Sequence, residues 1–585
     1  MAETLISPGV LARENDQTQI TSQPIQAGAA IVGPTVKGQV EIPTLVTSYS
    51  EYTAKFGGSF TSGSDEYSHL TAISAYNYFQ NGGSTLLVTR VASGGTTSFS
   101  EATSSFISGS TSGAIASGSA GGGTFTLETI GQGEIMNSTS TLSPEGSLPS
   151  GSSDNLRWEI VSPNTSSGVF SVIIRRGDDN TKSKSVVESF TNVSLDPKSP
   201  NYIARQIGDM KQNKVGSGSD VYLQTSGSYP NVSKFVRVKS VSLKTPDYLD
   251  NDGNAKDKFK DFIPVAQSGS FGDAGGSIFS SFATGDKFYN EIKDGNTQGL
   301  VGSDYTIAFN LLANKDEFRY NVITAPGLIK TNGVQGTALD TLISNIEGRG
   351  DAIIVVDLEN YGSGVTTTTG TAATLDTSYA AAYWPWVMVT DPNTGQLVWV
   401  PASTLIPGVY ASNDNSSEAW FAPAGINRGG LGTVRQAERK LTQANRDSLY
   451  IDKVNPIASF PGKGIVVFGQ KTLQTKPTAL DRINVRRLLI ELKSYISQVS
   501  DNLVFEQNSG ATRNTFLSQV NPYLESVQQR QGLYAFKVTM DDTNNTADVI
   551  DRNQLVGAIY IQPTKTAEFI YLDFNILPTG ATFPA

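Results

Sequence analysis

Hydrophobic residues recur at helical spacing near the C-terminus, within and just after "TALDRINVRRLLIELK" (478–493). The positions that form this apolar stripe are Val485, Leu488, Leu489, Leu492 and Ile496. Their spacing places them on one face of an α-helix. Thr478, with Asp481 three residues later, predicts a capped start of this helix. A second helix is expected from the apolar stripe of Phe516, Val520, Tyr523, Leu524 and Val527, with a kink at Pro522 and an end at Gly532.

Alternating and continuous apolar runs predict strands elsewhere in the chain. "AIIVV" (352–356) has the unbroken apolar character of a strand buried on both faces. "GVFSVIIRRGDDN" (168–180) predicts the first strand of a hairpin, because Gly and Asp after an alternating run favour a tight turn. "EFIYLDFNIL" (568–577) alternates without a break. Its apolar face is formed by Ile570, Leu572, Phe574 and Ile576.

These patterns indicate a multidomain protein of mixed α/β and α+β class. A chain of 585 residues is too long for a single core. Low-complexity text such as "SGSTSGAIASGSAGGG" (108–123) predicts a segment that builds no core. The expected segments are a polar N-terminal arm (1–24), an α/β unit (25–92), a Gly/Ser-rich insertion (93–153), a β-rich domain (154–310), an α/β domain (311–450), a C-terminal helix-and-sheet domain (451–577) and a tail (578–585).

The charge balance argues against direct nucleic-acid binding. Lys and Arg number 44 and Asp and Glu number 54, so the net charge is −10 and the chain is repelled by phosphate. The longest apolar runs are far shorter than a membrane span, and no membrane insertion is expected. The start "MAETLISPGVLARE" has neither the basic region nor the apolar core of a signal peptide, so we expect no export by the general route.

The residue types offer little for catalysis, and we expect no enzyme activity and no cofactor. There is no cysteine, and a Ser–His–Asp triad could use only His69, which we expect at a polar helix position. "YLDNDGNAKDKF" (248–259) is similar to a calcium loop, but Tyr248 and Phe259 occupy its first and last ligand positions, so a solvated turn is expected. No complete phosphate-binding P-loop is present, so nucleotide hydrolysis is not expected to drive any mechanical work.

Five separated segments of the chain form a recognisable set: "SPGV" (7–10), "AAIVGPTVKGQVEIPTLVTSYSEYTAKFGG" (29–58), "WFAPAGINRGGL" (420–431), "DRINVRRLL" (481–489) and "DRNQLVGAIYIQPTKTAEFIYLDF" (551–574). With these segments the chain resembles the contractile tail sheath proteins of myovirus-type bacteriophages. They occur in the order in which the family has them. Several matches in one order are more specific than any single match.

The resemblance implies a structural subunit that polymerises as stacked hexameric rings around a tail tube. The sheath would be metastable when extended, and its contraction would drive the tube through the host envelope. The implied partners are further copies of the chain, the tail tube protein, the baseplate, and tail terminator or neck proteins. The implied location is the phage tail of the virion, after assembly in the host cytoplasm. An α/β inner core, part of it labelled subtilisin-like as a fold name, would carry an outward β-rich insertion.

The resemblance also implies two arms, each of which adds a strand to the sheet of a neighbouring subunit. The N-terminal arm would use Val10, Leu11, Ala12 and Arg13. The C-terminal arm would use the alternating strand that contains Ile570, Leu572, Phe574 and Ile576.

Basic residues of the expected helix after Thr478 form the candidate docking surface. Arg482, Arg486 and Lys493 fall opposite the apolar stripe and, with Arg487, are expected to dock on the tail tube or an adjacent sheath subunit. The alternative is a solvated helix face with local ion pairs, such as one between Arg487 and Glu491.

Two other functions stay open at this point. One is the sheath of a tailocin or of a secretion-type injection machine. Type VI sheaths are normally split into two chains and tailocin sheaths are shorter, so a long single chain with an insertion favours a phage. The other is a subtilisin-like hydrolase, which would need an acid–base residue in a cleft, and His69 is the only histidine for that role.

Overall fold

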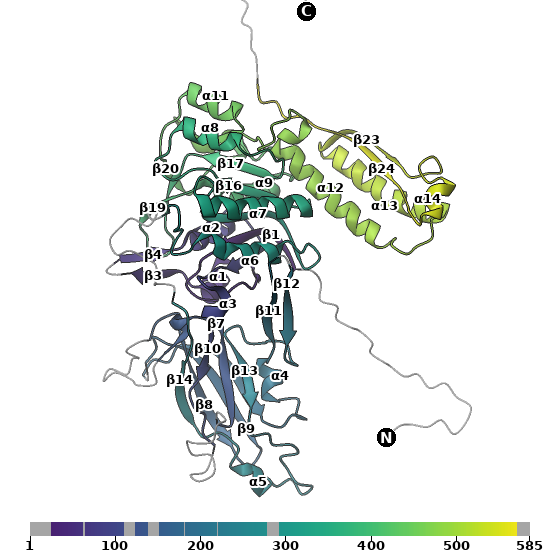
Figure 1. Ribbon diagram of the computed structural model, residues 1–585. Coiled ribbons are helices and arrows are strands. Elements are labelled where there is room, and N and C mark those ends of the chain that lie inside the picture. Colours follow the sequence, from purple (N-terminus) through teal and green to yellow (C-terminus); the bar gives the residue numbers. More distant parts are fainter. Residues whose placement is uncertain are drawn as a thin grey trace, which may run out of the picture.

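The centre of the protein is an eight-stranded sheet with helices on both faces (Figure 1). The computed structural model describes residues 25–62, 65–109, 123–138, 151–180, 182–218, 220–277 and 292–569. In order across the sheet, the strands are β2 (Thr44–Val46), β5 (Leu86–Arg90), β1 (Ile25–Gly33), β15 (Phe318–Ile329), β16 (Ile353–Asp357), β17 (Ala380–Trp384), β21 (Val454–Phe460) and β22 (Gly464–Val467). The strands from β5 to β21 are parallel, and the edge strands β2 and β22 are antiparallel to their neighbours.

The sheet separates two hydrophobic cores. Successive residues of a strand point to opposite faces, so Ala29 and Ile31 of β1 enter one core, and Ala30 and Val32 enter the other. One face is covered by α1 (Tyr49–Phe56), α2 (Leu70–Gln80) and α9 (Ile406–Ser416). The other is covered by α6 (Thr306–Leu312), α7 (Gly333–Arg349), α8 (Val365–Ala373) and α11 (Gln443–Ile451). Burial on both faces explains why the sequence of β16 is continuously apolar.

This sheet corrects two expected domain boundaries. The segments 25–92 and 311–450 are not separate units, since β1 pairs directly with β15. The sheet also continues past residue 450, because β21 pairs with β17. Long-range strand pairing joins segments that composition alone separates.

A second domain is built on a seven-stranded sheet, below the central sheet in Figure 1. Its strands, in order, are β10 (Val186–Ser194), β9 (Val169–Arg176), β8 (Leu156–Asn164), β14 (Gln267–Gly272), β6 (Glu101–Ser104), β7 (Phe125–Gln132) and β13 (Val236–Val241). Antiparallel pairing of β9 with β10 confirms the predicted hairpin. The short helix α3 (Gly95–Ser98) comes directly before β6. The short helices α4 (Ile203–Ile207) and α5 (Asp257–Lys260) contribute Ile203 and Phe259 to the core of this domain. A hairpin of β11 (Lys211–Ser217) and β12 (Asp220–Ser226) lies against α6, where Asn310 donates to the Gly218 carbonyl.

The segment 93–153 was expected to build no core, and this is wrong for its described part. Strands β6 and β7 pair with each other inside the seven-stranded sheet. Ala102, Phe125 and Leu127 are buried in that domain's core. A strand needs only a few apolar residues at alternate positions, so overall Gly/Ser content does not exclude it.

The C-terminal domain extends to the right in Figure 1. It consists of α12 (Ile483–Asp501), α13 (Gly510–Gln529), β23 (Leu533–Thr539), α14 (Ala547–Asp551) and β24 (Ala558–Pro563). Its core joins Leu488 and Leu492 of α12 to Phe516 and Val520 of α13. Small sheets of β3 (Ser59–Ser62) with β4 (Asp65–Ser68), and of β18 (Val387–Thr390), β19 (Leu397–Val400) and β20 (Val434–Ala437), border the central sheet.

Candidate functional site

Helix α12 attaches the C-terminal domain to the central sheet. Its start differs from the prediction, because Thr478 caps a preceding 3₁₀ turn (Ala479–Asp481), and Arg482 is the N-cap of the helix itself. The backbone N–H of Ile483 donates to the Gln470 carbonyl, which ties the first turn to the loop after β22.

The helix has apolar residues on two sides rather than one. Leu488 and Leu492 belong to the C-terminal core, whereas Ile483 and Ile490 pack into the core beneath the central sheet. A helix placed between two cores exposes little surface along its first turns. That placement decides the environment of the basic residues.

The expectation that a basic stripe faces a partner is wrong for Arg486 and Arg487, which are only 4% and 5% exposed. The Arg486 guanidinium lies 4.0 Å from the centroid of the Tyr379 ring and donates to the Ser378 hydroxyl. Burial lowers the pKa of Arg486 below its ordinary value. These contacts join α12 to the segment that leads into β17, inside one subunit.

Arg487 makes an ion pair different from the one considered on sequence grounds. It donates to the Asp414 carboxylate at 2.5 Å, and not to Glu491. Its guanidinium also lies 4.7 Å from the centroid of the Tyr410 ring. Because Asp414 and Tyr410 belong to α9, Arg487 fastens α12 to a helix of the central domain.

Arg482 holds the last described part of the chain. Its Nε and a terminal guanidinium nitrogen donate to the two carboxylate oxygens of Glu568, at 2.8 and 3.0 Å. The Tyr450 hydroxyl donates to the same carboxylate at 2.7 Å, and the Gln470 side chain donates at 2.9 Å. We call Arg482, Tyr450, Gln470 and Glu568 the Glu568 clip.

The pKa of Glu568 reflects this clip. Partial burial alone would raise the pKa, but hydrogen bonds from Arg482, Tyr450 and Gln470 to the ionised form lower it below the usual value for glutamate. The carboxylate is therefore charged and held at neutral pH, just before the chain continues into residues 570–585.

Lys493 is the exposed member of the four basic residues that were predicted to dock. Its Nζ lies 3.5 Å from the Tyr379 hydroxyl, and the residue is otherwise open to solvent. Sequence reasoning missed Glu568, Tyr450 and Asp414 as partners, since each lies more than 30 positions away from the arginine that it contacts. No local pattern could have pointed to them.

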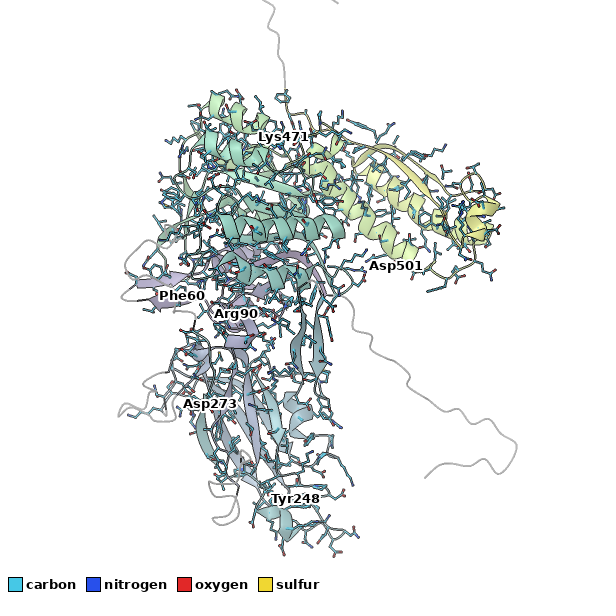
Figure 2. The ribbon with its side chains drawn as sticks, viewed as in Figure 1. Phe60, Arg90, Tyr248, Asp273, Lys471 and Asp501 are labelled. Atoms are coloured by element: carbon cyan, nitrogen blue, oxygen red, sulfur yellow. The ribbon has the colours of Figure 1, made fainter. Side chains whose placement is uncertain are left out.

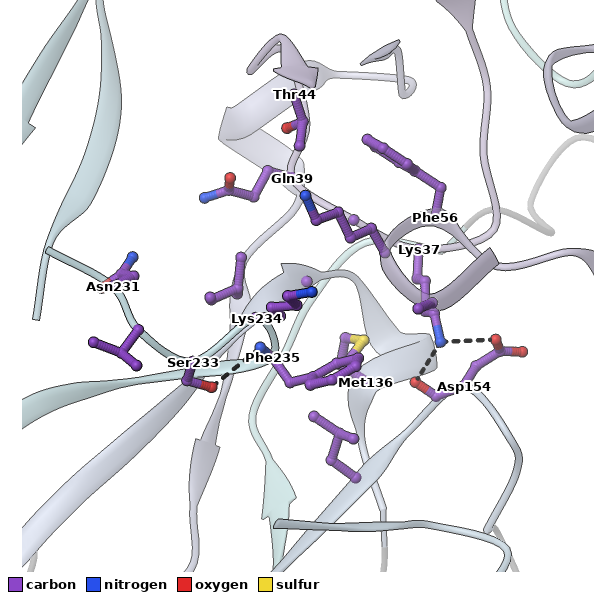
Figure 3. A pocket seen from close by; sticks show the side chains of 17 residues that line it. Lys37, Gln39, Thr44, Phe56, Met136, Asp154, Asn231, Ser233, Lys234 and Phe235 are labelled. Atoms are coloured by element: carbon purple, nitrogen blue, oxygen red, sulfur yellow. Dashed lines mark hydrogen bonds and ion pairs between the residues drawn. The ribbon is translucent and has the colours of Figure 1, made fainter. Parts of the chain in front are cut away.

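The central sheet domain also has a junction with the seven-stranded domain, drawn close up in Figure 3. A cavity of about 340 Å³ there is lined by residues of both domains. Lys37 spans one side, with its Nζ 3.1 Å from the Asp154 carboxylate and 3.4 Å from the Asp154 carbonyl oxygen (Figure 3). Nearby, the fully buried Arg90 donates to the Gly38 and Gln132 carbonyls (labelled Arg90 in Figure 2). These contacts link the two domains, and the Lys37 ammonium group is paired with the Asp154 carboxylate.

The catalytic candidates gain no support from their surroundings. His69 is the N-cap residue of α2, stacks on Phe60 and is buried, which lowers its pKa to about 3. In the loop 248–259, whose sequence is similar to a calcium loop, the Asp250 carboxylate accepts hydrogen bonds from the backbone N–H groups of Asp252 and Asn254, which is the pattern of a turn. Among the described residues, no group of three or more His, Asp or Glu side chains is arranged to hold a metal. No helix of the described chain is both long and apolar enough to cross a membrane.

The predicted arms lie outside the described residues. This applies to Val10, Leu11, Ala12 and Arg13, and to Ile570, Leu572, Phe574 and Ile576. The sheet beside the C-terminal end is described, however. Strands β23 and β24 pair antiparallel with each other and with no other described strand, so each has one edge without a partner strand in that part of the chain.

Two families match this chain. The "Phage tail sheath protein central domain" family matches residues 299–473, and the "Phage tail sheath C-terminal domain" family matches 475–577. The tail sheath protein of Vibrio phage KVP40 is 38% identical over 233 residues, which are 39% of this chain and 35% of that protein. The tail sheath protein of Enterobacteria phage T4 is 42% identical over 185 residues, which are 32% of this chain and 28% of that protein.

The two matched regions are adjacent in the chain. Their boundary near residue 474 falls between β22 and the turn before α12, which is the junction that Arg482, Arg486 and Arg487 fasten. The sheath central domain as matched begins at residue 299, although β1 and β5 belong to the same sheet. The match spans about a third of the length of the curated tail sheath proteins.

A solved structure aligns with most of the chain. The crystal structure of a sheath tail protein from Listeria innocua aligns with a TM-score of 0.50 at 10% sequence identity. The alignment covers 92% of this chain and 95% of that one. At this identity the likeness concerns the fold alone, and it agrees with a mixed α/β multidomain protein.

Proposed function

We propose that this chain is the structural subunit of a contractile phage tail sheath. Copies polymerise as stacked hexameric rings around a tail tube, in a metastable extended state whose contraction drives the tube through the host envelope. The partners are further copies of the chain, the tail tube protein, the baseplate and the tail terminator or neck proteins. Assembly takes place in the host cytoplasm, and the product is part of the virion. Matches to both sheath domains support this function.

The observation that carries the proposal is the two-stranded sheet of β23 and β24. The sheet packs on α13 in the C-terminal core, and each edge without a described partner strand presents backbone N–H and C=O groups that can pair with another strand. Residues 1–24 could span up to ~80 Å at ~3.3 Å per residue, which is enough to reach a neighbouring subunit. Residues 570–585 leave from the Glu568 clip, which holds their point of departure. Strand addition by these two arms would link the subunits into a mesh.

The strand contacts are strong enough to hold an assembly. A strand of about five residues forms about five backbone hydrogen bonds, each contributing ~1 kcal/mol. The contact recurs at every subunit, so the lattice can stay connected while subunits move as rigid bodies between two packings. The work of contraction then comes from the difference between those packings.

Deletion of residues 1–20 tests the proposal. The truncated subunit should remain folded, with an unchanged circular dichroism spectrum, because the polar sequence of that segment predicts no contribution to a core. It should fail to form contraction-competent sheaths in electron micrographs, whereas full-length protein forms them. Normal contractile sheaths from the truncated protein would overturn the strand-exchange mechanism.

A further inference from the structure

The far end of the C-terminal domain is formed by two loops. One joins α12 to α13 (502–509), and the other joins β23 to β24 and includes α14 (540–557). The Asn508 side chain donates to the Asn545 side chain and to the Gln554 carbonyl, and Arg513 donates to both Asn508 and Asp542. These bonds hold the loops together as one surface, which we call the tip.

The tip exposes large apolar side chains. Val504 is 60% exposed and Phe505 is fully exposed. Phe505 also has φ = 71°, in the left-handed region that bulky residues rarely adopt. Ile550 and Val556 add exposed apolar surface on the second loop. An aromatic side chain held in solvent by a strained backbone gains nothing for folding, so a binding role accounts for it better.

The tip is also acidic. Its two loops contain five carboxylates and one guanidinium group, which leaves a net charge of −4: Glu506, Asp541, Asp542, Asp548, Asp551 and Arg552. Asp501 and Arg513 lie beside the loops and add one charge of each sign. The two arginines pair with Asp542 and Asp548. The complementary surface is therefore an apolar cavity bordered by unpaired positive charge.

Such a surface lies at the other end of the same domain. A cavity of about 440 Å³ beside the Glu568 clip is lined by Phe468 and Phe569, both well exposed, and by Arg428 and Arg446. Its lining also contains two carboxylates, Glu568, which is paired with Arg482, and Asp447, which accepts from Gln443. Within the described chain, Arg428 and Arg446 donate to backbone carbonyls and to Gln443, and neither pairs with a carboxylate. We call this surface the groove.

The tip cannot reach the groove of its own subunit. The groove lies near the start of α12 and the tip at its end, as the labels Lys471 and Asp501 indicate in Figure 2. The 19 residues of α12 separate them by ~28 Å at 1.5 Å per residue. Contact between the two surfaces must therefore join different molecules.

We propose that the tip of one subunit docks into the groove of a second copy of this chain. Phe505 enters between Phe468 and Phe569, while Asp501 and Glu506 approach Arg428 and Arg446. The two surfaces differ, so the contact is head-to-tail and leaves a free tip and a free groove at the ends of every chain of subunits. The inference rests on the proposed sheath function and adds a contact distinct from strand exchange.

The test uses full-length protein and measures the critical concentration for polymerisation by light scattering. Phe505→Ser in the tip and Phe468→Ser in the groove should each raise it about 30-fold, as loss of an anchoring aromatic does. Leu397→Ser removes a similarly exposed apolar residue from β19 and should leave it unchanged. Circular dichroism should show all three variants folded.

Charge reversal provides a sharper test. Glu506→Arg and Arg428→Glu should each impair polymerisation, since every contact then joins like charges. An equimolar mixture of the two variants should polymerise, because alternating copies restore opposite charges at every contact. Asp252→Arg, in the seven-stranded domain, is the charge control.

The outcomes separate this inference from the proposed function. Wild-type polymerisation by Phe505→Ser, or failure of the mixed variants to co-polymerise, would overturn docking while leaving the sheath function intact. Loss of binding to preformed tail tubes without loss of self-assembly would assign the tip to the tube and equally overturn the proposal. If wild-type protein forms no polymer, the sheath function itself fails.

Discussion

Reversal of the charge at Arg486 should destabilise the protein strongly, although the sequence placed this residue opposite the apolar stripe of the helix. Arg486 is 4% exposed and lies against the Tyr379 ring. In Arg486→Glu, a carboxylate would replace the guanidinium over the negative face of that ring, with no described cation as its partner. An unpaired buried charge of this kind costs about 3–5 kcal/mol. Lys493→Glu, seven residues further along the same helix and exposed, should change stability by no more than about 0.5 kcal/mol.

Urea unfolding monitored by tryptophan fluorescence measures the difference, because Trp420 packs in the C-terminal core. With a slope of about 2 kcal/mol/M, a loss of 3–5 kcal/mol lowers the midpoint of that transition by about 1.5–2.5 M. The Lys493→Glu midpoint should stay close to that of wild type. Equal midpoints for the two variants would refute the assignment of Arg486 to the interior, and would restore it as a candidate for docking.

Three further predictions follow from named contacts. The folded-state pKa of Glu568 is lowered, so the clip stabilises fully above the ordinary glutamate pKa of about 4.3 and is lost as pH falls through the lower folded value. Glu568→Gln should therefore speed amide hydrogen exchange at 564–569 at pH 7, and the difference from wild type should shrink as pH falls below about 4.3. Burial raises the pKa of Asp357 to about 7, so wild-type stability should fall as pH rises from about 4 to about 7, whereas the melting temperature of Asp357→Asn should lack that fall. Deletion of 93–153 should unfold the seven-stranded domain, and Phe125→Ala alone should cost ~3–5 kcal/mol in denaturant unfolding, because Phe125 is fully buried there; a folded deletion protein would contradict the place of β6 and β7 in that core.

Several elements were predictable because their determinants are local. Helix α12 follows from the spacing of Val485, Leu488 and Leu492, which depends only on the helical repeat. The buried strand β16 and the β9–β10 hairpin follow from apolar runs and turn residues in the same way. The absence of cysteine and the single histidine, read from composition, already excluded thiol chemistry and left one residue for a triad.

The sequence by itself thus determined the element types, the family resemblance and the scarcity of catalytic groups, each of which depends on residues close together in the chain or on composition. The tertiary structure alone decided which side of α12 meets solvent. Periodicity distinguishes an apolar face from a polar one, but it cannot show that a second core packs against the polar face and buries Arg486 and Arg487. The tertiary structure also decided that Glu568 contacts Arg482 across 86 positions, and that 25–92 and 311–450 share one sheet. Such contacts form because the folded chain brings distant side chains together, and no local pattern records them.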